Sequence, residues 1–198
     1  MIQPIYVYDQ QILEQPCPDV PHNSPILTNL IIDLWDTMRN AQGCGLSAPQ
    51  IGVSYSVFII DSKSVFQSIG KGFRHKYYEP DDKGITETFI NAQLIQTSSE
   101  IWTAKEGCLS LPSLIRDVSR PWKIKVSYFN QNLEKQECEF TGLTARMILH
   151  ELDHINGVLL LAHLLPFSQK MLYFKLKSIK NGKVKVTYPT MKKQKLVA

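Results

Sequence analysis

The chain has 198 residues, of which 43% are apolar and 20% charged, a composition that fits one folded domain and excludes a largely disordered protein. No stretch approaches the roughly 18 uninterrupted apolar residues of a membrane span, and MIQPIYVYDQQ lacks the basic-then-apolar order of a signal peptide, so we expect a cytoplasmic protein. The net charge of +4 is unevenly spread: nine lysines and no acid lie from Lys170 onward, so the residues before it carry a net charge of −5.

The first half of the chain predicts one helix and two strands. SPILTNLIIDLWDTMRNAQG predicts a helix with Ser24 as its cap, Pro25 at its first position and an end near Gly43. Its apolar residues recur on one face, at Leu27, Leu30, Ile31, Leu34 and Met38. YSVFIID then predicts a strand buried on both faces, and ETFINAQLIQ predicts another strand. Between them, residues 62–88 hold glycines, charges and EPDDKG, which predict an exposed excursion.

The second half predicts one more strand and two helices. WKIKVSYFN alternates apolar and polar residues and predicts a half-buried strand with a hairpin turn at NQN. GLTARMILHELDHING predicts a helix that ends at Gly157, and SQKMLYFKLKSIKNG predicts a single helix that ends at Asn181 and Gly182. We therefore expect an α+β fold, a single domain over residues 1–198 with a lysine-rich segment from about 170. Its antiparallel or mixed strands would pack around the helix in GLTARMILHELDHING.

This central helix carries a metal-site pattern. His150 and His154 are four residues apart, so on a helix they lie about 40° apart around the axis and roughly 6 Å along it. Glu151 follows the first histidine, which gives H-E-x-x-H, the arrangement that places a carboxylate beside a metal held by two imidazoles. The helix also has an apolar face of Leu143, Met147, Ile148, Leu152 and Ile155, so its polar residues need partners. Chance occurrence is the alternative, and a third ligand is required.

Two metalloprotease patterns fail to supply that ligand. A metzincin would place its third histidine at position 160, where this chain has Leu160. A thermolysin-like site would use a downstream glutamate, and no glutamate follows Glu151, so the third ligand is an aspartate or an upstream residue. Upstream, KEGCLSLPSL contains Cys108, whose thiolate would complete a Cys-His-His set with a fourth position open for water. A buried structural thiol is the alternative for this cysteine.

Three motifs in one order resemble the signatures of the peptide deformylases. They are GCGLSAPQ from Gly43 to Gln50, EGCLS from Glu106 to Ser110, and the helix motif, and the resemblance extends from about residue 5 to residue 188. It implies that Cys108, His150 and His154 ligate the metal and that Glu151 is the general acid/base. It also implies that Gln50 and the backbone N–H of Leu109 bind the oxyanion, and that Gly43 and Gly45 let the peptide approach as an extended strand. The implied reaction is hydrolysis of the formyl group from N-formylmethionyl nascent peptides, with release of formate.

The sequence specifies the pocket for the methionine side chain and the identity of the metal less closely than the metal ligands. For the methionine side chain we expect an apolar pocket formed by Cys44, Leu143 and Met147 together with Gly43, although each side chain could equally belong to the core. Mixed thiolate and imidazole ligands suit Fe²⁺, Zn²⁺, Ni²⁺ or Co²⁺. The resemblance favours Fe²⁺ in the cell, with zinc, nickel or cobalt in some preparations.

Several positions depart from the family pattern. Leu149 stands where a glutamine is usual, Ser47 replaces an alanine, and Ile115 occupies a commonly basic position with Arg116 and Arg120 nearby. Asn-Ala at positions 91–92 replaces the more usual Asn-Pro. Because the residues implied to perform chemistry are all present, we expect activity. The alternatives are a divergent paralogue that deacylates another N-acyl peptide, a different metal amidase or protease, and an inactive metal-binding protein at the ribosome.

The expected partners follow from the same features. The substrate would be the N-formylmethionyl end of a nascent peptide. The lysine-rich segment predicts either a solvated face or an electrostatic contact with ribosomal RNA. No coiled-coil repeat or interface stripe is present, so we expect a monomer with no membrane partner.

Overall fold

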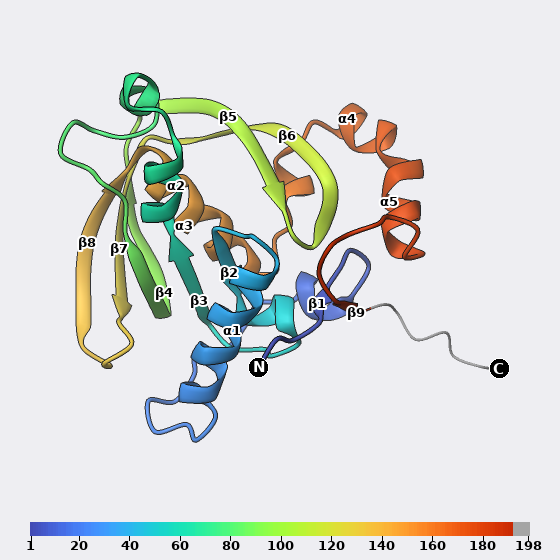
Figure 1. The fold of residues 1–198 in the computed structure, drawn as a ribbon, viewed down its shortest axis with the longest axis horizontal. Coiled ribbons are helices and arrows are strands. Elements are labelled where there is room, and N and C mark those ends of the chain that lie inside the picture. Colours follow the sequence, from blue (N-terminus) through green and yellow to red (C-terminus); the bar gives the residue numbers. More distant parts are fainter. Residues whose placement is uncertain (192–198) are drawn as a thin grey trace.

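The computed structural model describes residues 1–191 and contains helices and antiparallel sheets (Figure 1). The lysines at 192, 193 and 195, which belong to the basic run predicted from the sequence, lie outside the described residues. Within the described residues no helix is both long and apolar enough to cross a bilayer. The strands are β1 Ile5–Tyr6, β2 Gly45–Ser47, β3 Val57–Asp61, β4 Thr86–Thr97, β5 Ile101–Cys108, β6 Leu111–Pro121, β7 Lys123–Phe129, β8 Lys135–Thr141 and β9 Thr190–Met191. The helices are α1 Leu27–Asn40, α2 Ser62–Ser68, α3 Gly142–Ile155, α4 Pro166–Met171 and α5 Tyr173–Lys180, with short 3-10 turns η1 Gln11–Glu14, η2 Ala48–Ile51, η3 Lys71–Lys76 and η4 Leu160–His163.

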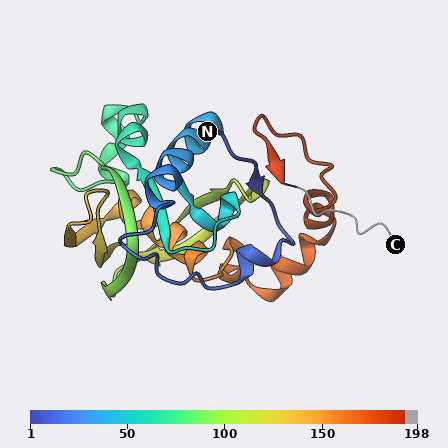
Figure 2. The same cartoon turned by 90° about the horizontal axis from the view of Figure 1, so that it is seen from below.

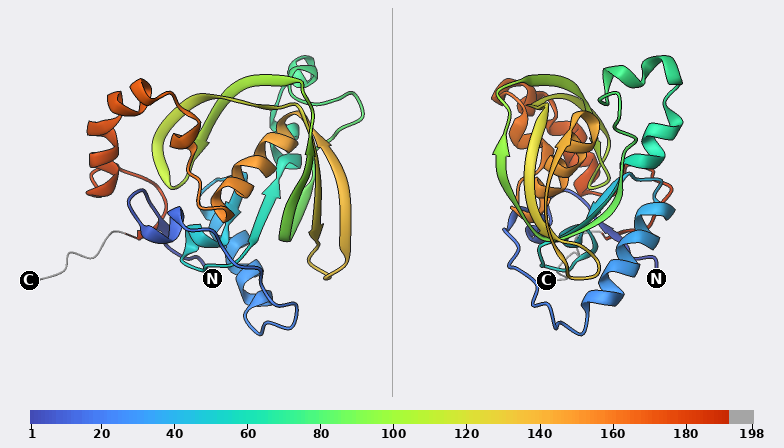
Figure 3. Two further views of the ribbon diagram at one scale, coloured as in Figure 1. Left: turned by 180° about the vertical axis from the view of Figure 1, so that it is seen from behind. Right: turned by 90° about the vertical axis from the view of Figure 1, so that its left-hand side faces the viewer.

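The described residues form three sheets, two of which contact the helix α3. The largest is antiparallel with strand order β2-β3-β4-β7-β8, β5 and β6 form a long antiparallel hairpin, and β1 pairs with β9 in parallel. Helix α3 packs against β2, β3 and β8 of the large sheet and against β6 of the hairpin. Seen from behind, α3 runs between the large sheet and the C-terminal helices (Figure 3). The expected α+β class with strands around a central helix is therefore confirmed.

The core explains why these segments fold as they do. All four apolar residues of β3 from Val57 to Ile60 have 0% exposure, which confirms a strand buried on both faces. On the large sheet, the Phe89 ring stacks on Phe58 with centroids 4.7 Å apart and contacts Tyr128 at 4.2 Å. Helix α3 adds its predicted apolar face to the same cluster, with Ile148 completely buried.

Glycine starts α3 where the chain must turn sharply. Gly142 has a φ of +53°, and a Cβ there would overlap the carbonyl oxygen of Tyr77. That carbonyl accepts the N–H of Leu143 at 2.8 Å. The other end of α3 is closed by Gly157 at φ +73°, as the sequence predicts. The direction of α3, and with it the direction of its histidines, is fixed at both ends.

Several elements differ from the sequence predictions. Helix α1 begins at Leu27 with Ile26 as its N-cap and no side-chain cap bond, so Ser24 and Pro25 lie in the turn that precedes the helix. The single C-terminal helix is two helices, since the chain turns at Leu172 and buries this residue in a core cluster together with Leu176. The excursion at 62–88 is exposed along much of its length but contains α2 and η3. The hairpin β5–β6 was not predicted as a pair of strands.

Candidate active site

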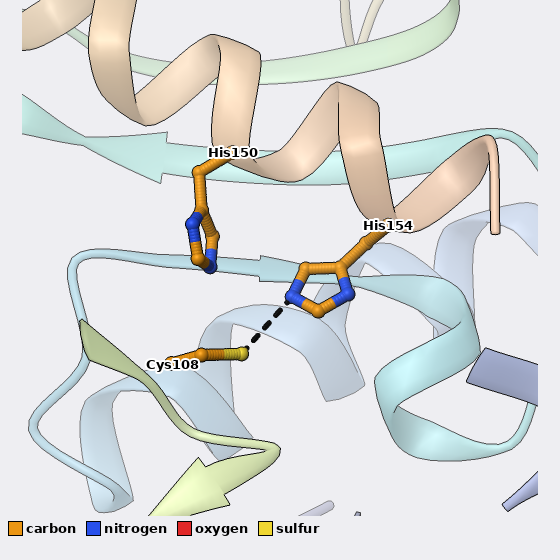
Figure 4. A group of neighbouring side chains, drawn as sticks. All are labelled: Cys108, His150 and His154. Atoms are coloured by element: carbon orange, nitrogen blue, oxygen red, sulfur yellow. Dashed lines mark hydrogen bonds between the residues drawn. The ribbon is translucent and has the colours of Figure 1, made fainter. Parts of the chain in front are cut away.

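Three potential metal ligands converge below helix α3. His150 and His154 project from one face of α3 and Cys108 ends β5 (Figure 4). Their ligand atoms all lie within 4.8 Å of one another, and the Cys108 Sγ is 3.2 Å from the His154 Nε2. Ligand atoms that share a tetrahedral metal lie roughly 3.3 to 3.6 Å apart, given bond lengths of about 2.0 to 2.3 Å. The trio can hold one ion after a small inward shift of its side chains, and no fourth His, Cys, Asp or Glu among the described residues belongs to the group.

The surroundings of Cys108 favour its thiolate form. Burial by itself raises the pKa of this thiol, but the neighbouring imidazoles of His154 and His150 outweigh burial and hold the pKa well below its usual value. A thiolate is the form that ligates a metal. The chemistry of the donors therefore fits a divalent ion.

A buried ion network holds His150 from the opposite side. The His150 Nδ1 lies 3.1 Å from the Glu106 Oε2, which leaves its Nε2 to face Cys108 and His154. Glu106 also accepts from the Arg120 Nε and the Arg146 Nη1, both at 2.6 Å. Burial opposes ionisation of Glu106, yet hydrogen bonds from His150 and Arg120 lower its pKa far below the usual value. This carboxylate fixes the ring orientation of His150.

A second carboxylate completes the charge balance of the network. The Arg120 Nη2 lies 2.9 Å from the Asp153 Oδ2, which also contacts the His163 Nε2 at 2.7 Å. The two guanidinium groups, of Arg120 and Arg146, therefore face the two carboxylates of Glu106 and Asp153. Because Arg120 is only 3% exposed and committed to this network, it does not face the cavity as a substrate contact.

Glu151 lies beside the histidines, and one of its oxygens has no hydrogen-bond partner among the described residues. It is 4% exposed, and this oxygen is its Oε2. Burial raises its pKa to about 6, against the opposing effect of the two neighbouring imidazoles. A Cβ at Gly45 would lie 2.6 Å from its Oε1, so only glycine at this position of β2 leaves room for the carboxylate. A buried polar oxygen without a partner is typical of a group that contacts water or substrate.

Gln50 and Leu109 lie on two loops that meet at the same place. The Gln50 Oε1 accepts the backbone N–H of Ser47 at 2.9 Å, which directs its Nε2 toward the EGCLS loop. That Nε2 lies 3.1 Å from the Ser110 Oγ and 3.8 Å from the Cys108 Sγ. Leu109 lines the cavity next to this amide. The Gln50 amide and Leu109 therefore lie together at the cavity, beside Cys108.

A cavity of about 690 Å³ opens in front of these groups. Gly43, Cys44, Leu143 and Met147, predicted to form the methionine pocket, all line it. So do His150, Glu151, Cys108 and Gln50. The structure thus brings the sequence-predicted residues to the lining of one cavity, except His154, which is buried beside Cys108.

The family model for polypeptide deformylases matches residues 2–170. The chain belongs to the peptide deformylase family. Its similarity to individual deformylases extends over nearly the whole chain. It is 37% identical to the peptide deformylase of Christiangramia forsetii over 95% of this chain and 94% of that protein. It is 34% identical to that of Salinibacter ruber over 98% of this chain and 96% of that protein.

Solved deformylase structures have the same fold. The peptide deformylase of Legionella pneumophila has a TM-score of 0.77 at 30% identity, covering 92% of this chain and 98% of its own. The Ehrlichia chaffeensis deformylase, solved in complex with actinonin, has a TM-score of 0.76 at 27% identity, covering 93% of this chain and 99% of its own.

The departures from the deformylase pattern have different structural consequences. Ser47 caps the η2 turn and donates its hydroxyl to the Gln50 Oε1 at 3.0 Å, so it adds a bond behind that amide. Leu149 is 7% exposed and belongs to the apolar core of the large sheet. Ile115 is 59% exposed at the cavity edge. Asn91 holds Val20 through hydrogen bonds to both its N–H and its carbonyl.

Sequence reasoning gave no role to the deformylase residues that support the ligands. Arg146 is a charged residue one turn before His150 on a mostly apolar helix, and it is 2% exposed. A charge at such a position signals a buried partner, which is a usable sequence cue. Glu106 lies within the EGCLS motif, but nothing in its spacing indicates that it contacts His150.

Proposed function

We propose that Cys108, His150 and His154 hold one divalent metal ion, Fe²⁺ in the cell. The supporting observation is the convergence of one thiolate and two imidazoles, a mixed donor set that suits Fe²⁺, Zn²⁺, Ni²⁺ or Co²⁺. When bound, such an ion polarises a carbonyl oxygen and lowers the pKa of water toward neutrality. As a peptide deformylase, the protein hydrolyses the formyl group from N-formylmethionyl peptides and releases formate.

Glu151 moves the proton in this reaction. Its buried carboxylate faces the cavity beside both histidines, and one oxygen has no protein partner in the described residues. It accepts a proton from the attacking water and transfers it to the departing amine nitrogen, which would otherwise leave as a poor anionic group. Gly45 supports this role because it leaves space for the carboxylate.

Two donors stabilise the negative oxygen that develops on the formyl carbon. We assign them to the Gln50 Nε2 and the backbone N–H of Leu109. Ser47 supports this assignment, since its bonds to the Gln50 Oε1 leave the amide nitrogen directed at the Cys108–Ser110 loop. Loss of one such donor typically lowers the rate by about 10² to 10³.

The methionine side chain binds against Gly43, Cys44, Leu143 and Met147. These residues surround the cavity next to the metal ligands, and Met147 contributes an adaptable thioether surface. The peptide lies extended beside the Gly43–Gly45 segment, where the two glycines let its backbone approach.

The decisive experiment measures formate release from formyl-Met-Ala-Ser by protein purified without oxygen, with bound metal quantified. The Glu151→Gln variant is expected to retain its metal and lose turnover. The matched control is Glu139→Gln, an exposed glutamate of β8 for which no change is expected. No turnover by metal-loaded wild type would contradict the assignment. Hydrolysis of only acetyl-Met-Ala-Ser would indicate a paralogue with another acyl preference, and cleavage of an internal peptide bond would indicate a protease.

The basic C-terminal segment supports a contact with the ribosome, where nascent chains emerge. We propose that the chain acts as a cytoplasmic, single-domain monomer and that this segment binds ribosomal RNA. The supporting observation is a run without acids whose described lysines are Lys170, Lys175, Lys177, Lys180, Lys183 and Lys185. Cosedimentation with ribosomes is expected to weaken steeply between 50 and 200 mM salt, because phosphate contacts release counterions. Cosedimentation that is absent at low salt would contradict the contact.

A further inference from the structure

The last described segment, Lys183–Met191, runs from α5 back to the substrate cavity. Its end, β9, pairs with β1 in parallel, with Ile5 opposite Thr190, and the Ile5 N–H donates to the Pro189 carbonyl at 2.8 Å. Figure 2 shows the two short strands side by side next to α5. The segment lines the cavity with four residues, Lys185, Val186, Thr187 and Tyr188. It lies beyond the residues that the family model matches.

Tyr188 connects this segment to the EGCLS loop. Its hydroxyl donates to the Leu109 carbonyl at 2.8 Å, across 79 residues of sequence. Burial raises the pKa of Tyr188 to about 12, so the hydroxyl keeps its proton and remains a donor at neutral pH. The next residue of the loop is also held, because the Ser110 carbonyl accepts the Tyr8 N–H at 2.9 Å. Two residues that flank the paired terminal strands, Tyr8 after β1 and Tyr188 before β9, therefore donate hydrogen bonds to adjacent carbonyls of one short loop.

These bonds act on the backbone torsions of Leu109. A fixed Leu109 carbonyl restricts ψ at this residue, and the preceding Cys108 is restricted by its approach to the two histidines. The N–H of Leu109 lies between these two constraints. Its direction determines whether it reaches a developing oxyanion, and a displacement of about 1 Å in such a group can lower the rate by about 10²-fold.

We propose that Tyr188 is a positioning residue for the reaction: its hydroxyl holds the Leu109 backbone so that the Leu109 N–H points at the reacting formyl oxygen. This role rests on the proposed function, in which Leu109 supplies one of the two oxyanion donors. The segment Lys183–Met191 is then part of the active site even though it contributes no metal ligand. A purely structural role would instead confine the effect of Tyr188 to packing against the apolar residues around it.

The test compares Tyr188→Phe with wild type and with Tyr173→Phe, which removes an exposed hydroxyl from the same C-terminal region. For Tyr188→Phe we expect kcat on formyl-Met-Ala-Ser to fall by about 5- to 30-fold, with KM changed less than about 2-fold and bound metal unchanged. Tyr173→Phe is expected to match wild type. A second readout needs no turnover: the Leu109 amide hydrogen is expected to exchange faster with solvent in Tyr188→Phe.

The outcomes distinguish a failure of the proposed function from a failure of the positioning role of Tyr188. Inactive wild type would contradict the proposed function, while the amide exchange would still decide whether Tyr188 orders Leu109. Active wild type with unchanged kcat and unchanged exchange in Tyr188→Phe would overturn the positioning role alone. A lower melting temperature with unchanged kcat would also overturn it, because that result assigns Tyr188 to packing.

Discussion

Replacement of Glu106 by glutamine tests how far the ion network supports the metal ligands. In the native protein two carboxylates, Glu106 and Asp153, face two guanidinium groups, Arg120 and Arg146, and the Glu106 contacts with both arginines are buried. Glu106→Gln leaves one net positive charge in a site where both arginines are at most 3% exposed. It also places an amide among the N–H donors of the arginines and of His150. Removal of one member of a buried ion pair costs about 3–5 kcal/mol, so a loss of this size is expected.

The same variant is expected to bind metal more weakly. Without the carboxylate, the His150 Nδ1 loses the acceptor that orients its ring, and such losses typically reduce metal affinity by about 10- to 100-fold. Urea unfolding of the metal-free protein measures the first effect, and competition with a chromophoric chelator measures the second. The unfolding measurement can therefore contradict the expected loss of stability, and the competition measurement can independently contradict the expected loss of metal affinity.

The control is Glu137→Gln on β8. Glu137 pairs with Lys125 at 2.6 Å, a separation equal to that of Glu106 and Arg146, but the Glu137 side chain is 51% exposed. Solvent screens this pair, so no measurable change in stability is expected. If Glu106→Gln unfolds at the same urea concentration as Glu137→Gln and binds metal equally well, the reasoning about burial is wrong.

Three further outcomes follow from the site and the core. Gly45→Ala is expected to lower kcat by about 10²-fold, because its Cβ would displace the Glu151 carboxylate, whereas Gly72→Ala, with open space around it, should match wild type in the formate assay. Phe89→Ala is expected to destabilise the protein by about 3–5 kcal/mol in urea unfolding, since the completely buried ring contacts three other aromatic rings. Leu94→Ala on the same strand, at 44% exposure, should stay within about 0.5 kcal/mol of wild type. Chelation is expected to abolish turnover and lower the melting temperature, and added Fe²⁺ should restore both; full activity of metal-free protein would contradict the proposed metal site.

Elements with a strong local pattern were predictable from the sequence. Helix α3 follows from apolar residues at helical spacing and from the glycine that ends it, and β3 follows from a short β-branched run. The hairpin β5–β6 escaped prediction because its inward positions include charged residues, Glu106 and Arg120, so its alternation does not look apolar. Their partners belong to another element, α3, which no local pattern reveals.

By itself, the sequence identified the residues of the candidate site through three motifs in one order. It also identified the helix that carries His150, Glu151 and His154, because H-E-x-x-H and helical periodicity operate within a few residues. Tertiary structure alone decided what supports those residues. Arg146 reaches Glu106 across 40 residues and Tyr188 reaches Leu109 across 79. Tertiary packing also decided where the C-terminal helix breaks, since Leu172 is buried against residues of β6 and η4. Such contacts depend on which buried polar groups and apolar faces meet after the chain has folded. No local sequence pattern specifies these long-range contacts.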